Sequence, residues 1–181
     1  KIIASKAAPK LCPVTLELGG KNPNIILSDA DLEIAIPGVI DGMRYTRQGQ
    51  ACTAGSRVYI HEKIYDKVLD GAVKKLSKLK MGNALDEKSD IGAIISEEQL
   101  KRTLYYMDIA KKNSSTKILH GGNQSKGGEY KDGFYYEPTL LSGLPVSSPV
   151  CQEEVFGPVA CAIPFKSFDE VMKSANDTQF G

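Results

Sequence analysis

Cys52 lies in the stretch RQGQACTAGSR, residues 47–57, where small residues and glycines surround its thiol. A thiolate is a strong nucleophile, and its electrophile needs a clear path to the sulfur. Alanine and glycine neighbours leave that path open, and glycine permits the backbone angles that turn N–H groups toward a reacting atom. The stretch therefore predicts a nucleophile accessible to a small substrate. The alternative is a cysteine buried in a tight turn, because free cysteine is among the most buried residue types.

Glu17 is the second residue whose setting suggests chemistry. It lies in an otherwise apolar stretch, VTLELGG, immediately before a glycine pair. A partly buried glutamate has a raised pKa and can act as a general base near neutral pH. The alternative is that strand alternation points Glu17 toward solvent on an edge strand, which is the ordinary place of a glutamate.

The stretch EEVFGP, residues 153–158, places Glu154 and Phe156 two positions apart. In an extended segment, side chains at this spacing project to the same side. A carboxylate beside an aromatic side chain suits a pair of sugar hydroxyls attached to a flat heterocycle. The alternative is a loop entering a strand, with one exposed acid and one core aromatic residue.

The elements that must position these residues alternate between strands and helices. Strands are expected at residues 14–18 and 24–27, at SRVYIH, at KILH, at FYYEPTLL around Pro138, and at the end of CQEEVFGPVACAIPF. Helices are expected within the first ten residues, closed by Pro9, over 31–48, over 64–79, after the capping box SEEQ at 96–99, and after SFDE at 167–170. This alternation predicts an α/β fold with an open, largely parallel sheet and helices on both of its faces.

Details of the predicted helix over 31–48 follow from single residues. Asp29 or Asp31 is expected to cap its start, and Gly49 is a natural stop. Pro37 falls inside the helix and should kink it or mark its real start. Arg57, the last residue of the thiol stretch, is interpreted as an anchor for the loop.

Composition narrows the class of protein. A chain of 181 residues is long enough for one domain with a sizeable core, and its net charge of +1 gives no electrostatic reason to expect nucleic acid or a membrane surface. No apolar run approaches the roughly 20 residues that span a bilayer. Four scattered cysteines and two histidines match no metal-ligand spacing, and sparse cysteine fits a reducing, cytoplasmic compartment. The first residue is not methionine, and the chain is interpreted as a piece of a longer one.

The three motifs together carry a resemblance that none carries alone. ELGGKNPNIILSDADL, RQGQACTAGSR and QEEVFGPV, in this order, resemble the NAD(P)-dependent aldehyde dehydrogenase family over essentially the whole chain. The resemblance implies an incomplete aldehyde dehydrogenase catalytic domain. Residues 1–19 would be the tail of a cofactor-binding domain and a hinge, and residues 20–181 a catalytic domain truncated at its C-terminal end. It also implies a homo-oligomer at full length and a piece that is inactive alone.

The resemblance assigns a role to each candidate residue. It implies that Cys52 is the catalytic nucleophile and Glu17 the general base. On the cofactor side, it implies that Glu154 binds the nicotinamide ribose, that Phe156 lies beside the ring system, and that the backbone at Gly19 passes close to the nicotinamide. Gln99 is either another ribose contact or only the last residue of the capping box, and both interpretations stay open.

The implied reaction oxidises an aldehyde to a carboxylic acid with NAD or NADP. Cys52 would form a thiohemiacetal and then a thioester, which water activated by Glu17 would hydrolyse. One alternative is the branch of enzymes that releases the thioester to coenzyme A. A second is a cysteine–histidine hydrolase that uses Cys52 with His61 or His120, and a third is a noncatalytic binding or assembly module.

Overall fold

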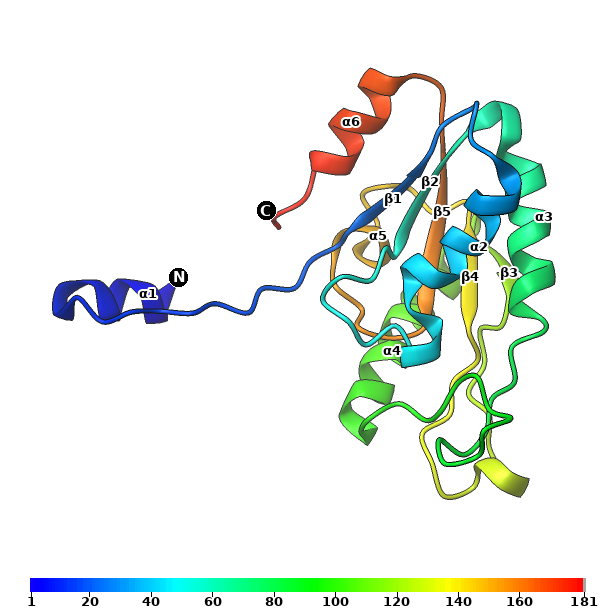
Figure 1. Ribbon diagram of the computed structural model, residues 1–181, viewed down its shortest axis with the longest axis horizontal. Coiled ribbons are helices and arrows are strands. Elements are labelled where there is room, and N and C mark those ends of the chain that lie inside the picture. The colour runs from blue at the N-terminus through cyan, green and yellow to red at the C-terminus, as the bar shows by residue number, and fades with distance from the viewer. Residues whose placement is uncertain (181) are drawn as a thin grey trace.

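The computed structural model describes residues 1–180, so Gly181 of the predicted 20–181 domain lies outside it. A five-stranded sheet has the order β1-β2-β5-β4-β3 (Figure 1). Four strands run parallel: β1 (Pro23–Ile26), β2 (Arg57–His61), β5 (Val159–Phe165) and β4 (Thr139–Ser142). The edge strand β3 (Lys117–His120) is antiparallel to β4. This arrangement confirms the predicted open, largely parallel sheet.

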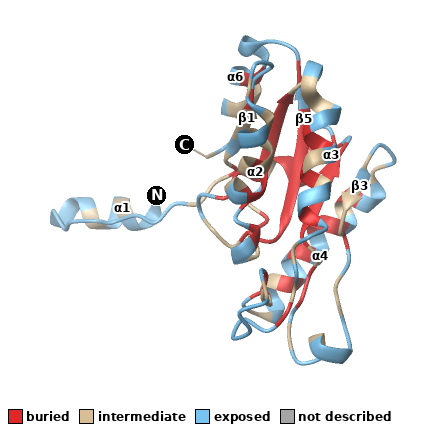
Figure 2. Cartoon of the chain, turned by 45° about the vertical axis from the view of Figure 1, so that its right-hand side comes forward, coloured by how far each residue is buried: buried red, intermediate tan, exposed pale blue. Residues whose placement is uncertain are grey.

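Helices cover both faces of the sheet, as predicted. The first face packs against α2 (Leu32–Met43) and α3 (Tyr65–Leu76). The second face packs against α4 (Glu97–Lys112), α5 (Pro149–Gln152) and α6 (Phe168–Asn176). Side chains of β2 alternate between the two layers, because successive residues of a strand point to opposite faces. The three central strands β2, β5 and β4 are the most buried part of the molecule, as Figure 2 shows.

Side-chain caps begin three of the helices where the sequence predicts them. Asp31, rather than Asp29, caps α2 by accepting a hydrogen bond of 2.9 Å from the backbone of Glu33. Ser96 caps α4 and Ser167 caps α6 in the same way, each through its hydroxyl oxygen. Local capping chemistry therefore fixes these starts, and Pro37 lies within α2 rather than at its beginning.

Two predicted helix ends are wrong. The helix predicted over 31–48 ends at Met43, and Arg44 takes a left-handed conformation with φ of 58°. A short 3₁₀ turn, Tyr45–Arg47, follows, and the buried Tyr45 hydroxyl donates a 2.7 Å hydrogen bond to the Thr139 carbonyl on β4. That long-range bond draws the chain toward the sheet before Gly49. The helix predicted over 64–79 is α3, which ends at Leu76.

Residues 11–22 form no strand, so the strand predicted at 14–18 is wrong. No other strand within residues 1–180 pairs with this segment, and a strand needs a partner for its backbone groups. Its alternating apolar side chains are exposed; Leu18, for example, is 75% accessible. The predicted N-terminal helix is present as α1 (Ile2–Ala7) and a 3₁₀ turn, Ala8–Lys10. The first residues thus form an arm that leads away from the body (Figures 1 and 2).

Of the helices described, none has the length and apolar character needed to cross a membrane.

Candidate functional site

The thiol loop, residues 48–56, joins the 3₁₀ turn after α2 to the start of β2. Gly49 has φ of +64°, and a side chain there would overlap the Gly157 carbonyl. At the far end of the loop, the Gly55 backbone donates a 2.8 Å hydrogen bond to the Gly42 carbonyl in α2. Cys52 lies between these two anchors and is exposed, which excludes its interpretation as a buried turn cysteine.

Asn22 fastens the thiol loop to the segment after the glycine pair. Its side-chain Nδ2 donates to the Cys52 carbonyl at 2.7 Å and to the Ala54 carbonyl at 3.3 Å. Two bonds from one amide fix the backbone that follows the nucleophile candidate. Sequence reasoning missed this residue, although it stands next to Lys21 in GGKN, within a motif already singled out.

The glycine pair and Glu154 lie in direct contact. The Glu154 carboxylate accepts a 3.2 Å hydrogen bond from the Gly20 backbone through Oε1. A methyl group on Gly19 would overlap the same carboxylate. Only glycine therefore allows the backbone and the carboxylate to approach this closely. Oε2 of Glu154 forms no hydrogen bond within residues 1–180 and is available as an acceptor.

The loop that carries Glu154 and Phe156 is held by α4. Gln99 Nε2 donates to the carbonyls of Val155 and Phe156, at 3.0 and 2.7 Å. Arg102 donates to the carbonyls of Val155 and Glu154, at 3.3 and 2.5 Å. These bonds hold Phe156 at φ of 58°, a conformation that non-glycine residues rarely adopt. The segment is therefore not extended at Phe156, and the sequence argument from extended geometry does not apply.

The Gln99 alternatives are resolved in part by these contacts. The Ser96 hydroxyl accepts from the Gln99 backbone, which is one half of a capping box. The Gln99 side chain does not return to the cap, because its Nε2 binds the 155–156 carbonyls. Gln99 therefore positions the loop of Glu154, and a direct ribose contact stays a prediction.

Further along the same face of α4, two more residues hold this loop. A side chain on Gly157 would overlap the buried Thr103 side chain. The Tyr106 hydroxyl donates to Glu153 Oε2 at 2.7 Å, and burial together with that bond raises the pKa of Tyr106 to about 12. Positions 99, 102, 103 and 106 share one face because helical neighbours recur every three or four residues.

One small hollow joins the three motifs. A cavity of about 10 Å³ is lined by Gly20 from the glycine pair, by Ala51 and Ala54 from the thiol loop, and by Glu154 and Phe156 from the EEVFGP loop. Segments that are far apart in the sequence therefore meet at the thiol loop. The structure thus brings together the loop that carries Cys52, the glycine pair and the loop that carries Glu154, and Cys52 itself is next to Ala51 rather than in the lining.

Within residues 1–180, no contact joins Glu17 to that group. It is exposed on the N-terminal arm, and its side chain takes part in no hydrogen bond or ion pair within the described chain. The arm pairs with no strand at this point. The alternation of side chains along residues 14–18 therefore leaves the Glu17 carboxylate exposed. The role of Glu17 as a general base stays a prediction.

The two histidines lie elsewhere in the fold. His61 is at the opposite end of β2 from the thiol loop and accepts a 3.2 Å hydrogen bond from the Lys63 backbone. His120 is on the edge strand β3, where Nδ1 bonds the Pro138 carbonyl at 2.8 Å. A hydrolase pairing of Cys52 with either histidine therefore has no geometric support.

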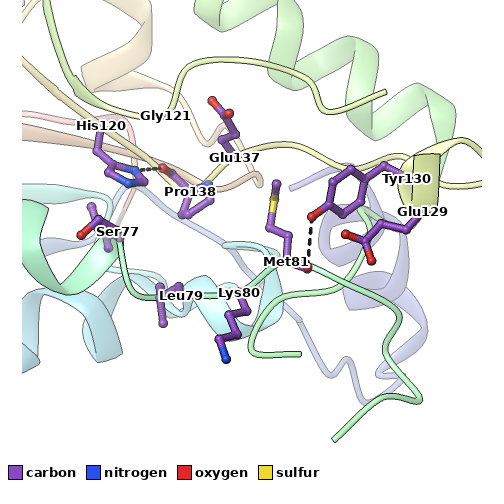
Figure 3. Close-up of a pocket in the computed structure, with 11 residues that line it drawn as sticks. Ser77, Leu79, Lys80, Met81, His120, Gly121, Glu129, Tyr130, Glu137 and Pro138 are labelled. Carbon is purple, nitrogen blue, oxygen red and sulfur yellow. Dashed lines mark hydrogen bonds between the residues drawn. The ribbon is translucent and has the colours of Figure 1, made fainter. Parts of the chain in front are cut away.

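A wider hollow lies away from Cys52. It measures about 520 Å³, and Figure 3 shows His120, Glu129, Tyr130 and Glu137 along its wall. The Tyr130 hydroxyl donates across it to the Met81 carbonyl at 3.3 Å. His120 lines it, but none of the residues assigned to the dehydrogenase site does. Within residues 1–180, no cluster of three or more His, Cys, Asp or Glu side chains could hold a metal ion.

Comparisons with known proteins confirm the family resemblance that the three motifs carry. A family model described as the aldehyde dehydrogenase family matches residues 1–181. The chain is 40% identical over 181 residues to a protein named putative aldehyde dehydrogenase DhaS from Bacillus subtilis, covering all of this chain and 35% of that protein. It is 39% identical to D-glyceraldehyde dehydrogenase (NADP(+)) from Picrophilus torridus, covering 99% of this chain and 36% of that protein.

Solved structures show the same likeness in three dimensions. An NAD+ complex of aldehyde dehydrogenase from Bacillus cereus superposes with a TM-score of 0.91 at 38% identity, over 99% of this chain and 35% of that one. Betaine aldehyde dehydrogenase from Staphylococcus aureus, also with NAD+, gives a TM-score of 0.91 at 38% identity with the same coverage. The chain therefore spans about 35% of the length of the relatives it matches.

Proposed function

The chain belongs to the aldehyde dehydrogenase family, and on that premise we propose that its protein oxidises an aldehyde to a carboxylic acid with NAD+ or NADP+. One observation carries the proposal. The exposed Cys52 thiol is on a loop that shares a hollow with the glycine pair and with Glu154. A nucleophile beside an acceptor for sugar hydroxyls is the arrangement that such chemistry needs.

The residues present fit a dinucleotide on the wall next to the thiol. Glu154 keeps one carboxylate oxygen for a ribose hydroxyl while Gly20 holds the other. The absence of a side chain on Gly19 keeps this approach open, and the hydrogen bonds from Gln99 and Arg102 on α4 hold Phe156 in a fixed conformation. Held there, NAD+ or NADP+ supplies the hydride acceptor that converts a thiohemiacetal into a thioester. Gln99 is proposed to act chiefly through the loop it holds.

Cys52 is proposed to add to the aldehyde carbonyl carbon as a thiolate. The oxyanion that forms needs hydrogen-bond donors, and the Cys52 backbone N–H is one candidate. A preorganised donor of this kind contributes on the order of 3 kcal/mol to transition-state stabilisation. Asn22 holds the Cys52 carbonyl, and with it the peptide plane that follows the nucleophile.

Glu17 is proposed to draw a proton from the water that hydrolyses the thioester. Its position in the arm, two residues before Gly19, puts it on the segment that leads directly to the Glu154 contact. The arm also supports the domain division, in which residues 1–19 are the tail of the cofactor-binding domain and a hinge. Residues 20–181 would then be part of the catalytic domain, in a cytoplasmic homo-oligomer.

Rapid-mixing kinetics on the full-length enzyme test this mechanism. We expect Cys52→Ser to abolish both the first turnover and steady-state oxidation. Glu17→Gln should keep the first hydride transfer and slow steady-state turnover on the order of a hundredfold, because only hydrolysis needs the base. Cys12→Ser, which removes the other exposed thiol, is the matched control and should behave as wild type.

Two results would contradict the proposal. Turnover retained by Cys52→Ser would remove the nucleophile. Product formed only after addition of coenzyme A would replace hydrolysis by transfer to that thiol, and Glu17 would lose its role.

A further inference from the structure

Arg57 is a buried cation at the point where the thiol loop enters β2. It is 1% exposed, and no carboxylate forms an ion pair with it within residues 1–180. A buried charge needs compensation, because an unpaired ion loses its hydration on folding. The compensation comes from neutral acceptors, which are the carbonyls of Lys21, Ser174 and Ala175 and the hydroxyl of Tyr59. None of them belongs to the thiol loop, so the interpretation of the Arg57 side chain as an anchor for that loop is wrong.

On one side, the guanidinium of Arg57 holds the end of α6. Nη1 donates to the Ser174 carbonyl at 3.2 Å, and Nη2 donates to the Ala175 carbonyl at 2.8 Å. Carbonyls in the last turn of a helix lack partners within the helix, and a cation there also balances the partial negative charge of the helix end. Tyr59, two residues further along β2, points to the same face, and its hydroxyl lies 3.0 Å from the Ser174 hydroxyl. The end of α6 is therefore a fixed support for the guanidinium.

On the other side, Arg57 holds the segment 19–22. Its Nε donates to the Lys21 carbonyl at 2.8 Å, and its backbone N–H donates to the Asn22 carbonyl at 3.2 Å. One residue therefore holds two consecutive carbonyls of this segment. A guanidinium suits the task, because its N–H donors leave a planar fork in several directions and can bind two segments at once.

Two bonds lead from the segment 19–22 to the candidate site, one on each side of Lys21. The Gly20 backbone donates to the Glu154 carboxylate. The Asn22 side chain donates to two carbonyls of the thiol loop. Hydrogen bonds weaken steeply when distance and angle depart from their preferred values. Both bonds therefore depend on the backbone path that Arg57 fixes between them.

We propose that Arg57 is a positioning residue of the candidate site. It fixes the segment 19–22 against the end of α6. Gly20 then stays in place for Glu154, and Asn22 stays in place for the thiol loop. Arg57 acts through these residues and not by contact with the reacting atoms. Its effect on catalysis rests on the function proposed above, whereas its hold on the segment does not.

Hydrogen exchange of the full-length protein, followed by mass spectrometry, tests the hold on the segment. Arg57→Met removes the side-chain donors and keeps a long side chain. We expect the peptide that contains residues 19–22 to exchange roughly tenfold faster than in wild type, while α3 and α4 exchange as before, because the loss is local. Tyr59→Phe is the matched control, since it removes a hydroxyl on the α6 side and leaves the bond to Lys21 intact. Unchanged exchange at residues 19–22, or faster exchange throughout the chain, would overturn the proposal.

Steady-state kinetics on the same variant test the consequence for the site. Arg57→Met should raise the KM for NAD+ or NADP+ roughly tenfold through Gly20, and lower kcat roughly tenfold through Asn22. In an Asn22→Ala background, Arg57→Met should still raise KM but lower kcat no further, because the bonds that it supports are already absent. A second tenfold fall in kcat, or an unchanged KM in Arg57→Met alone, would show that Arg57 only stabilises the fold.

A second variant covers the case in which Arg57→Met does not fold. The single ammonium of Arg57→Lys cannot reach the Lys21 carbonyl and the end of α6 together, so the same changes are expected at about threefold. Failure of this proposal and failure of the proposed function give different results. A full-length protein that oxidises no aldehyde would refute the proposed function, whereas unchanged exchange at residues 19–22 would refute the role of Arg57 alone.

Discussion

The Glu154 carboxylate accepts a hydrogen bond of 3.2 Å from the backbone of Gly20, a residue 134 positions away in the sequence. This bond joins the EEVFGP loop to the glycine pair, and Asn22, two residues further on, joins the same segment to the thiol loop. The segment 19–22 is therefore the connection through which the candidate cofactor loop and the candidate nucleophile share one geometry.

Gly19→Ala should weaken cofactor binding. The added methyl group overlaps the Glu154 carboxylate, so the loop must shift, and overpacking of this kind costs about 1–3 kcal/mol. We expect the KM for NAD+ or NADP+ to rise about tenfold or more, measured by steady-state kinetics on the full-length enzyme. Gly38→Ala in α2 is the control, because nothing lies within 4 Å of its new methyl group. Equal KM values in the two variants would contradict the close contact.

Asn22→Ala should lower kcat more than it changes KM. The variant removes the two hydrogen bonds that fix the Cys52 and Ala54 carbonyls, and loss of such a bond in a partly buried place costs about 1–3 kcal/mol. We expect kcat to fall roughly tenfold to a hundredfold, because the thiol is no longer held for attack. Asn83→Ala, in the exposed loop before α4, loses only a local bond to Leu85 and should leave kcat unchanged. An unchanged kcat in Asn22→Ala would show that the bonds are dispensable.

Gln99→Ala should loosen the loop of Glu154 and Phe156. Without two donors to the 155–156 carbonyls, the left-handed conformation of Phe156 loses its support. The dissociation constant for NAD+ or NADP+, measured by fluorescence titration, should rise roughly tenfold. Lys101→Ala on the same helix removes only an exposed ion pair with Glu97 and should bind as wild type. If Gln99→Ala also binds the cofactor as tightly as wild type, the two hydrogen bonds from Gln99 have no role in cofactor binding.

Alkaline unfolding should depend on Tyr65. Burial raises its pKa to about 12, above the ordinary value of about 10, so the folded chain holds this proton more strongly than the unfolded chain. The stability linked to it is complete below about pH 10 and is lost as pH rises toward about 12. Denaturant unfolding across this range should show a smaller loss of stability for Tyr65→Phe than for wild type. Tyr105→Phe, at an exposed position of α4, is the control. A loss as large in Tyr65→Phe as in wild type would contradict the linkage.

The candidate site itself was partly predictable. Cys52, Gly19 and Glu154 are all found in short motifs whose residue types suggest chemistry, and two of the three motifs also begin or end at a strand. Asn22 and Arg102 gave no such signal, because each acts by donating to carbonyls of residues distant in sequence. An amide or a guanidinium reveals its partner only when the chain is folded.

Taken alone, the sequence determined the features that depend on near neighbours. The periods of α3 and α4, the caps at Asp31, Ser96 and Ser167, and the alternation that gives a parallel sheet are all set within a few residues. The tertiary structure decided where segments meet. The end of α2 follows from the bond between Tyr45 and Thr139, 94 positions apart, and residues 14–18 are not a strand because no partner lies beside them. Hydrogen bonds between distant segments have no local period, so only the folded chain can select them.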